Sequence, residues 1–443
     1  MTDCNTQLAF PFFKKSALVA NFQGGSVVTD AGLLLVRQFD ERIGFTEALS
    51  KVIYDPRDVR FIVHPQVDLI RQRLYQIIGG YEDCNDASRL RRDPIFKAIA
   101  GRAPEDIDLA SQPTLCRLEN RISSSTLVDF AEAQVRLFIQ TRPKPLKQIT
   151  LDIDPSEART HGHQQLTFFN AFYDSHMYFP NFLCDAETGF LLAALLRPGN
   201  VGAAEGALLL LARVVQILRA AWPGIRIDFR ADSNFAEPNL LNWLEEEKIP
   251  YAIGMAGNPV LQRLSSDFVK AVQESFERTG QSQRCFTSLR YEADTWPHPR
   301  RLVVKVEVTP MGTNVRYVIV TRAGKSADLY PWYTQRGGTI EDVIEELKNG
   351  FEGDRLSCET FDANAFRLLM HAAAYNLMVL FREQAAVPEL TRASIHTLRI
   401  KLLKAGAVVE RTARRVWVRL SSTWPFADLF RQAHRALVSQ PSG

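Results

Sequence analysis

The stretch from Gln148 to Glu157 constrains the fold more than any other part of the chain. Its apolar residues alternate with polar ones as far as Pro155, which is the period-two pattern of a β-strand with one apolar face and one polar face. Asp152 and Asp154 therefore leave the polar face together, about 7 Å apart. Pro155 lacks a backbone donor and ends the strand, so we expect Asp154 at its edge, within reach of a ligand. The alternative interpretation of this stretch alone is an ordinary solvated strand face.

The composition bounds the class of protein. A chain of 443 residues with 46% hydrophobic content is long enough for two or three domains with real cores. It has no run of about 18 uncharged apolar residues and no N-terminal basic segment followed by an apolar one, so we expect neither a membrane partner nor secretion. Its six cysteines lie far apart without a Cys-x-x-Cys pair, which favours a reducing cytoplasm over a zinc site or disulfide framework. They are Cys4, Cys84, Cys116, Cys184, Cys285 and Cys358.

The charge is unevenly distributed. The net charge is only +3, but the segment Thr391–Gly443 holds ten Lys and Arg residues against Glu410 and Asp428. A basic tail on a mildly acidic body indicates a polyanionic partner, although solvated helix faces carry such charges too.

Residues 1–145 read as a helical domain. Short helices in Tyr81–Pro94 and Ser111–Arg121 resemble a helix-turn-helix reader of DNA, and a helical domain with an arginine-rich surface is the alternative. The arginines of these helices are Arg89, Arg91, Arg92, Arg117 and Arg121. Two prolines in Thr141–Pro145 mark the linker that ends the domain.

The pattern changes to alternating strands and helices over residues 146–257. After the opening strand, further strand material occurs at Thr167–Tyr173, Tyr178–Cys184, Phe190–Leu196, Ile225–Asp232 and Tyr251–Met255, with helices at Gly202–Ala221 and Pro238–Glu247. Antiparallel strands followed by helix, strand, helix and strand are the ribonuclease-H arrangement.

A β-rich insertion at residues 258–330 interrupts this core. The core resumes at residues 331–385, where we expect a helix to open near Thr339, with the hydroxyl as its cap and Asp342 in its first turn. A basic region follows at residues 386–443. The predicted fold is therefore mixed α/β: a ribonuclease-H-like core with a β-rich insertion, a helical N-terminal domain and a helical C-terminal region.

Several short blocks resemble those of one enzyme family. The blocks are Leu151–Ser156, Arg230–Ala236 and Tyr333–Arg336 with Glu341 and Lys348, supported by Arg197–Gly199, Asp354–Ser357 and Asp362–Asn364. They resemble the Asp, Asp and Glu blocks of bacterial insertion-sequence transposases of the DDE type. Those enzymes have a ribonuclease-H-like core, a β-strand insertion before the Glu and a Tyr-Arg-Glu-Lys signature. The resemblance covers nearly the whole chain.

The chain departs from the family pattern at one spacing. Four residues separate Arg336 from Glu341 where the family usually has three, and we expect Gly337–Gly338 to take up the extra residue in a turn before the helix. In the family a Ser or Thr follows the first Asp after one residue. Ser156 stands in that relation to Asp154, so Asp154 is our choice of ligand and Asp152 the second choice or a helper.

The resemblance implies a metal-dependent active site made by Asp154, Asp232 and Glu341. In such sites two Mg²⁺ ions (or Mn²⁺), roughly 3.5–4 Å apart, activate an oxygen nucleophile and stabilise the leaving 3′ oxygen, and hard cations prefer oxygen ligands. Tyr333, Arg336 and Lys348 would hold DNA phosphates, with Lys348 two helical turns beyond Glu341 on the same face. An ordinary helix entry with a charge pattern is the alternative for these three.

Trp296 lies in the insertion, where related transposases use an aromatic ring to stack on a displaced base. A tryptophan buried in the core of the insertion is the alternative.

The resemblance thus implies a cut-and-paste DNA transposase in the bacterial cytoplasm, associated with the nucleoid. Its partners would be double-stranded DNA, as terminal inverted repeats and target, and a second copy of the chain in a homodimer. A ribonuclease-H-fold nuclease without strand transfer and a DNA-binding remnant without catalysis are the alternatives.

Overall fold

The computed structural model describes residues 8–10, 12, 15–16, 18–385 and 387–439, so Cys4 lies outside the described residues. The chain forms two compact units. Unit 1 comprises Met1–Thr46, Arg57–Cys116 and Phe381–Gly443, and unit 2 comprises Glu47–Pro56 and Arg117–Leu380. The division differs from the five predicted segments, because the N-terminal part of unit 1 ends near residue 116 instead of 145 and the C-terminal region belongs to the same unit.

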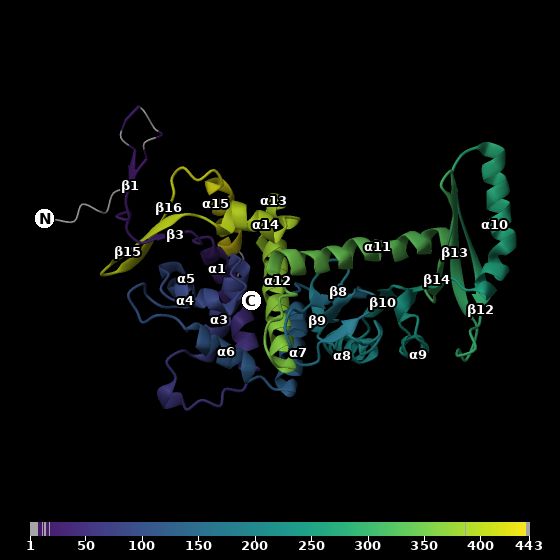
Figure 1. The fold of residues 1–443 in the computed structure, drawn as a ribbon, viewed down its shortest axis with the longest axis horizontal. Helices are drawn as coiled ribbons and strands as arrows, with labels where there is room; N and C mark the ends of the chain where they lie inside the picture. Colours follow the sequence, from purple (N-terminus) through teal and green to yellow (C-terminus); the bar gives the residue numbers. More distant parts are fainter. Residues whose placement is uncertain (1–7, 11, 13–14, 17, 386, 440–443) are drawn as a thin grey trace. The chain divides into compact units, whose positions relative to one another are not determined.

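An eight-stranded sheet forms the centre of unit 2 (Figure 1), with the order β12-β13-β14-β11-β10-β4-β8-β9. Its core strands are β4 (Gln148–Pro155), β8 (Asn181–Asp185), β9 (Leu191–Leu195), β10 (Arg226–Ala231) and β11 (Tyr251–Met255). The strands β4, β10 and β11 are parallel, and β8 and β9 are antiparallel to their neighbours. This topology confirms the predicted ribonuclease-H-like core.

The helices of unit 2 pack around this sheet. They are α7 (Ser124–Gln140), α8 (Ala207–Ala221), α9 (Pro238–Glu246), α10 (Pro259–Thr279), α11 (Ser326–Glu345) and α12 (Phe361–Ala385), of which α12 continues into unit 1. Helix α7 contacts α8 and β9. Helix α7 therefore packs with the core, although it lies before the predicted domain boundary at residue 145.

The insertion extends the core sheet. Its strands are β12 (Gln283–Tyr291), β13 (Arg300–Thr309) and β14 (Gly312–Val320), and α10 packs beside β12 and β13 (Figure 1). Strand β14 pairs antiparallel with the last core strand, with Ala252 opposite Val320. The insertion therefore shares backbone hydrogen bonds with the strand order that carries the acidic residues.

The strand material at Thr167–Tyr173 is not part of the core sheet. It forms β6 (Phe168–Asn170), which joins β5 (Ala158–Arg159) and β7 (Ser175–Tyr178) in a separate three-stranded sheet. Tyr178, the last residue of β7, donates a hydrogen bond to the carbonyl of Gln165 in the loop between β5 and β6.

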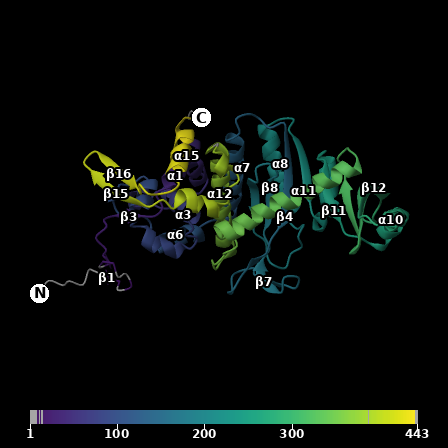
Figure 2. The ribbon, with the colours of Figure 1, turned by 90° about the horizontal axis from the view of Figure 1, so that it is seen from above.

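Helix α11 corrects one prediction. It runs without a break from Ser326 to Glu345, so no helix opens at Thr339, whose hydroxyl instead donates to the carbonyl of Gln335 within the helix. Gly337 and Gly338 are helical and have no positive φ. In Figure 2, α11 lies across the sheet, and it contacts β4, β8, β10 and β11.

Unit 1 is mostly helical but also contains strands. Its elements are β1 (Leu8–Ala9), β2 (Val19–Ala20), β3 (Val27–Val28), α1 (Leu33–Ile43), α2 (Phe45–Lys51, reaching into unit 2), η1 (Val59–Phe61), α3 (Gln66–Gly79), η2 (Cys84–Asp86), α4 (Ala87–Leu90), α5 (Pro94–Ile99), α6 (Gln112–Asn120, reaching into unit 2), α13 (Pro388–Thr391), α14 (Ile395–Leu398), η5 (Arg399–Leu403), β15 (Ala407–Thr412), β16 (Arg415–Leu420) and α15 (Ala427–Ser439). The predicted helical C-terminal region thus also holds a β-hairpin.

A strand from the N-terminal part of unit 1 pairs with one from its C-terminal part. Strand β3 pairs with β15, with Val28 opposite Ala407, in the sheet β16-β15-β3. Beside it, a Cβ on Gly32 would lie 1.9 Å from the carbonyl oxygen of Leu402, so only glycine permits this approach of the two backbones.

In the part of the chain that the structure describes, no helix is long and apolar enough to cross a membrane.

Candidate active site

Strand β4 has the predicted apolar face, with Ile149, Leu151 and Ile153 buried. Its opposite face is not solvated, because α11 covers it. Asp152 is 0% exposed, and its two carboxylate oxygens accept hydrogen bonds from Arg230 on β10, both at 2.7 Å. We therefore place Asp152 in a buried ion pair, where both of its oxygens already have a partner.

The same ion pair anchors α11. Arg230 Nη1 donates to the carbonyl oxygen of Trp332 at 2.6 Å, and the guanidinium carbon lies 5.2 Å from the centre of the Trp332 ring. Because Trp332 belongs to the first half of α11, the Asp152–Arg230 pair links β4 and β10 to this helix.

Asp154 lies two residues further along β4, where the strand ends. Arg336 of α11 donates to its Oδ2 at 3.1 Å, and both side chains are largely buried, at 17% and 12% exposed. Burial raises the pKa of Asp154 to about 6; the charges of Asp232 and Glu341 raise it too, and Arg336 opposes them. The structure therefore brings together the three predicted acidic residues and Arg336.

Asp232 follows the neighbouring strand β10 and caps the short 3₁₀ turn η3 (Ser233–Phe235). Its carboxylate accepts from the backbone N–H and the side-chain amide of Asn234, each at 2.9 Å. These bonds fix the carboxylate at the carboxyl end of a parallel strand adjacent to β4.

Glu341 reaches the site from α11 and is exposed. A Cβ on Gly337, one turn earlier, would lie 3.3 Å from Glu341 Oε1. The missing side chain at Gly337 therefore leaves room for the carboxylate along the helix, a role for this glycine that the sequence interpretation did not foresee.

Lys348 lies beyond Glu341 in η4 (Glu346–Gly350), where the helix changes to π geometry. We predicted that Lys348 lies two α-helical turns beyond Glu341 on the same face. The change to π geometry between the two residues makes this prediction wrong. Lys348 Nζ donates to Glu157 Oε1 at 3.0 Å and to Ser156 Oγ at 3.3 Å, next to the end of β4. Glu157 is a neighbour of the site that the sequence interpretation did not select.

Two tyrosines border the acidic residues. The pKa of Tyr333 is raised by burial, which Arg336 opposes, and by the charge of Asp232. The pKa of Tyr173 is raised by burial and then by the charges of Glu157, Asp154 and Asp232. Tyr173 was predicted only as the end of a strand and not as a site residue, and the structure places it in the turn between β6 and β7.

Trp296 is buried, at 6% exposed. Its ring packs edge-on against Tyr291 with the centroids 5.5 Å apart, and the Arg300 guanidinium carbon lies 4.8 Å from its centroid. This environment matches the core alternative, since no open ring face is available for a base in this arrangement.

The arginines predicted to read DNA in the N-terminal helices are mostly ion-paired. Arg89 pairs with Asp86, Arg91 and Arg92 pair with Asp108, and Arg121 pairs with Asp55. The helices that carry these arginines or precede them are α4, with four residues, and α6, with nine. The geometry favours the alternative of a helical domain with an arginine-rich surface.

The donor atoms around Asp154 suit a hard divalent cation. Asp154, Asp232 and Glu341 offer only carboxylate oxygens. Burial, and then the charges of Asp232 and Glu341, raise the pKa of Asp154, so a cation would stabilise the group. Such an ion would lower the pKa of a bound water and stabilise negative charge on a reacting phosphate.

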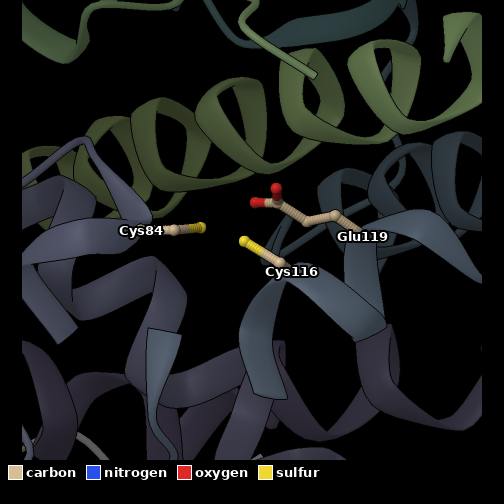
Figure 3. Close-up of side chains that lie close together, drawn as sticks. All are labelled: Cys84, Cys116 and Glu119. Carbon is tan, nitrogen blue, oxygen red and sulfur yellow. The ribbon is translucent and has the colours of Figure 1, made fainter. Parts of the chain in front are cut away.

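Another cluster of potential ligands lies elsewhere (Figure 3). Of the described His, Cys, Asp and Glu residues, only Cys84, Cys116 and Glu119 place three ligand atoms within 4.8 Å of one another. Glu119 already accepts a hydrogen bond from Arg367 at 2.7 Å, which balances its charge. We therefore assign no ion to this cluster. The ligand atoms of the three acidic residues of the site do not all lie this close together, and Arg336 lies beside Asp154.

Comparison with known proteins decides the family. The family model described as transposase DDE domain, group 1, matches residues 10–442. The chain belongs to this family. No curated protein matches the sequence. Among solved structures, the fold is similar to that of piggyBac transposase in a synaptic complex with hairpin DNA, with 13% identity and a TM-score of 0.42 over 85% of this chain and 80% of that one.

Membership in the DDE family makes the protein a DNA transposase, an enzyme that cleaves DNA and transfers strands in a reaction that depends on a divalent metal. The predicted DDE transposase family, the mixed α/β fold class and the reaction are confirmed.

Proposed function

We propose that Asp154, Asp232 and Glu341 hold two divalent ions, Mg²⁺ or Mn²⁺, and form the catalytic centre of a cut-and-paste transposase. The observation that carries the assignment is the shared electrostatic environment of the three acids. Asp154 has a pKa of about 6, raised by burial, Asp232 and Glu341, although Arg336 donates to it at 3.1 Å. The three acids come from β4, from the end of β10 and from α11, and the charges of Asp232 and Glu341 both act on Asp154.

Three basic or polar residues of the site would handle DNA phosphates. Arg336 is the strongest candidate, because its planar guanidinium can exchange the Asp154 carboxylate for a phosphate oxygen at the same place. Lys348 would likewise exchange the Glu157 carboxylate for a phosphate oxygen. Tyr333, one turn before Arg336 on α11, would donate a hydrogen bond to a phosphate. The role of these residues is to orient the scissile phosphate beside the acids.

The DNA partners would be the terminal inverted repeats of an insertion sequence and a target duplex on the bacterial nucleoid. Joining two ends at one target needs two active sites, so the working assembly would be a homodimer on DNA.

The test is Glu341→Gln, which keeps the size of the side chain and removes its charge. We expect the variant to bind terminal-repeat DNA normally and to lose both cleavage and strand transfer, because both reactions use the same site. A reduction of at least about a hundredfold is expected for loss of a charged ligand at a catalytic centre. Radiolabelled end DNA resolves the two steps on one gel.

Glu345→Gln and Glu346→Gln are the matched controls, since each removes one carboxylate further along the same helical segment. Normal cleavage by Glu341→Gln together with failure of a control would move the third acid to another residue. Normal cleavage by all three variants would contradict the assignment. Cleavage without strand transfer by the wild-type protein would instead identify the nuclease alternative.

A further inference from the structure

The hairpin of β15 and β16 projects from the core of unit 1. Val409 lies opposite Val418, and Val409 is buried at 7% exposed in the cluster that includes Val28. Beyond this pair, every residue from Glu410 to Trp417 is exposed. Figure 1 and Figure 2 both show the turn of the hairpin extending past the neighbouring helices of the unit. The outer half of the hairpin is thus held mainly by the pairing of its own two strands, with Arg411 bound to Glu105 outside the hairpin.

Positive charge collects on this outer half. Arg411 pairs with Glu105 and Arg419 pairs with Glu410, each at 2.8 Å. Among the residues that the structure describes, no carboxylate lies within ion-pair distance of Arg414 or Arg415, which form the turn and the first residue of β16. The tip therefore carries two arginines whose charge is not balanced.

The solvent face of β16 also carries arginines, here beside a tryptophan. Arg415, Trp417 and Arg419 occupy alternate positions and so share one face. The guanidinium carbons of Arg415 and Arg419 lie 5.7 and 5.3 Å from the centre of the Trp417 ring. Cation–π contacts of this kind restrict the two arginine side chains before any ligand arrives, which lowers the entropic cost of binding.

The dimensions fit a duplex groove. Three residues beyond Val409 extend the ribbon by about 10 Å at the usual strand rise, and its two strands lie about 4.8 Å apart. The major groove of B-DNA is about 12 Å wide and 8.5 Å deep and admits a two-stranded ribbon, whereas the minor groove is only about 6 Å wide.

We propose that the β15–β16 hairpin enters the major groove of double-stranded DNA, with Arg414 and Arg415 against the base edges. Arg411 in the outer half, and Arg419 just inside the Val409–Val418 pair, would contact phosphates. This inference rests on the proposed function for the presence of DNA, and it assigns sequence recognition to unit 1 at a place remote in sequence from the acidic residues.

The test compares two double variants of the full-length protein, each lacking two positive charges. Arg414→Ala with Arg415→Ala changes the hairpin tip, and Arg431→Ala with Arg435→Ala changes exposed residues of α15 in the same basic segment. The probes are a fluorescein-labelled duplex from the DNA flanking the coding sequence and a scrambled duplex of the same composition. Anisotropy titrations at several salt concentrations give the affinities.

We expect the tip variant to bind the flanking duplex at least about tenfold more weakly, and the scrambled duplex with a smaller loss, since an arginine–guanine pair discriminates against other bases. The α15 variant should lose less on both probes. Methylation of guanine N7, a major-groove atom, should interfere with binding of the wild type and not of the tip variant.

Equal losses in both variants on both probes would overturn the proposal in favour of diffuse charge, and unchanged affinity of the tip variant would overturn it outright. Because the readout is binding, it is independent of the Glu341→Gln cleavage experiment. A failure of the hairpin and a failure of the catalytic assignment are therefore distinguishable.

Discussion

Asp154→Asn tests the electrostatic picture of the site directly. The carboxyl has a pKa of about 6 in the folded protein against an ordinary value of 3.8, so the folded state binds its proton more tightly than the unfolded state does. The stabilising effect of that proton is fully present below about pH 3.8 and is lost as the pH rises through about 6. The shift of about two units corresponds to roughly 3 kcal/mol, of which about 2 kcal/mol is lost between pH 4 and pH 7.

The asparagine variant has no proton to lose at this position. Its free energy of unfolding, measured relative to the wild type in the presence of a chelator, should therefore improve by about 2 kcal/mol between pH 4 and pH 7. Urea titrations followed by tryptophan fluorescence measure this difference, and comparing two proteins at each pH cancels the titration of all other groups. Activity should be absent from the variant at every pH.

Asp342→Asn is the matched control, because Asp342 is exposed on α11 next to Glu341. Its stability should run parallel to that of the wild type across the pH range. Added Mg²⁺ should stabilise the wild type more at pH 7 than at pH 5, since the ion competes with the proton. Parallel curves for wild type and Asp154→Asn would refute the reasoning.

Three further variants test the surroundings of the site. Asp152→Asn leaves the buried Arg230 without a counter-charge and should cost about 3–5 kcal/mol of stability in urea, whereas Asp152→Leu combined with Arg230→Met should cost less; an equal loss would count against the ion pair. Trp296→Ala should lower the stability by about 3–5 kcal/mol as a core truncation, and an unchanged melting temperature with slow strand processing would instead support base stacking. Gly254→Ala would place its Cβ 2.7 Å from the hydroxyl of Tyr333, so DNA cleavage should fall while DNA binding persists. The control Gly257→Ala should be tolerated, because its Cβ would lie 3.6 Å from the nearest atom.

Local sequence patterns predicted the strands and helices of the core, because successive elements of the core are close together in the sequence. The alternation around Asp152 and Asp154 defined β4, and the β-rich insertion predicted at residues 258–330 contains β12, β13 and β14. The choice between the two acids needed the structure, since only the position of Arg230 shows that Asp152 is already paired. Family spacing pointed to Asp154, and its assignment as a metal ligand stays a prediction.

The failures came from non-local contacts. Gly337 and Gly338 suggested a break, yet packing of α11 across the sheet keeps them helical, because tertiary contacts outweigh the cost of about 1 kcal/mol per glycine. The packing of α7 on β9 crosses the predicted boundary at residue 145, and no local pattern in the sequence indicated this contact. Pairing of β3 with β15 joins segments almost 380 residues apart, which no short-range pattern reveals.

That pairing also orders events during synthesis. Ribosomes add about 5–20 residues per second, so roughly 20–80 s pass between the emergence of Val28 and that of Ala407. The acidic residues of unit 2 are translated within this interval, while β3 has no strand to pair with. A nascent chain can therefore complete its catalytic core before the unit that carries the arginine hairpin closes, and a message truncated before β15 yields the acids without the hairpin.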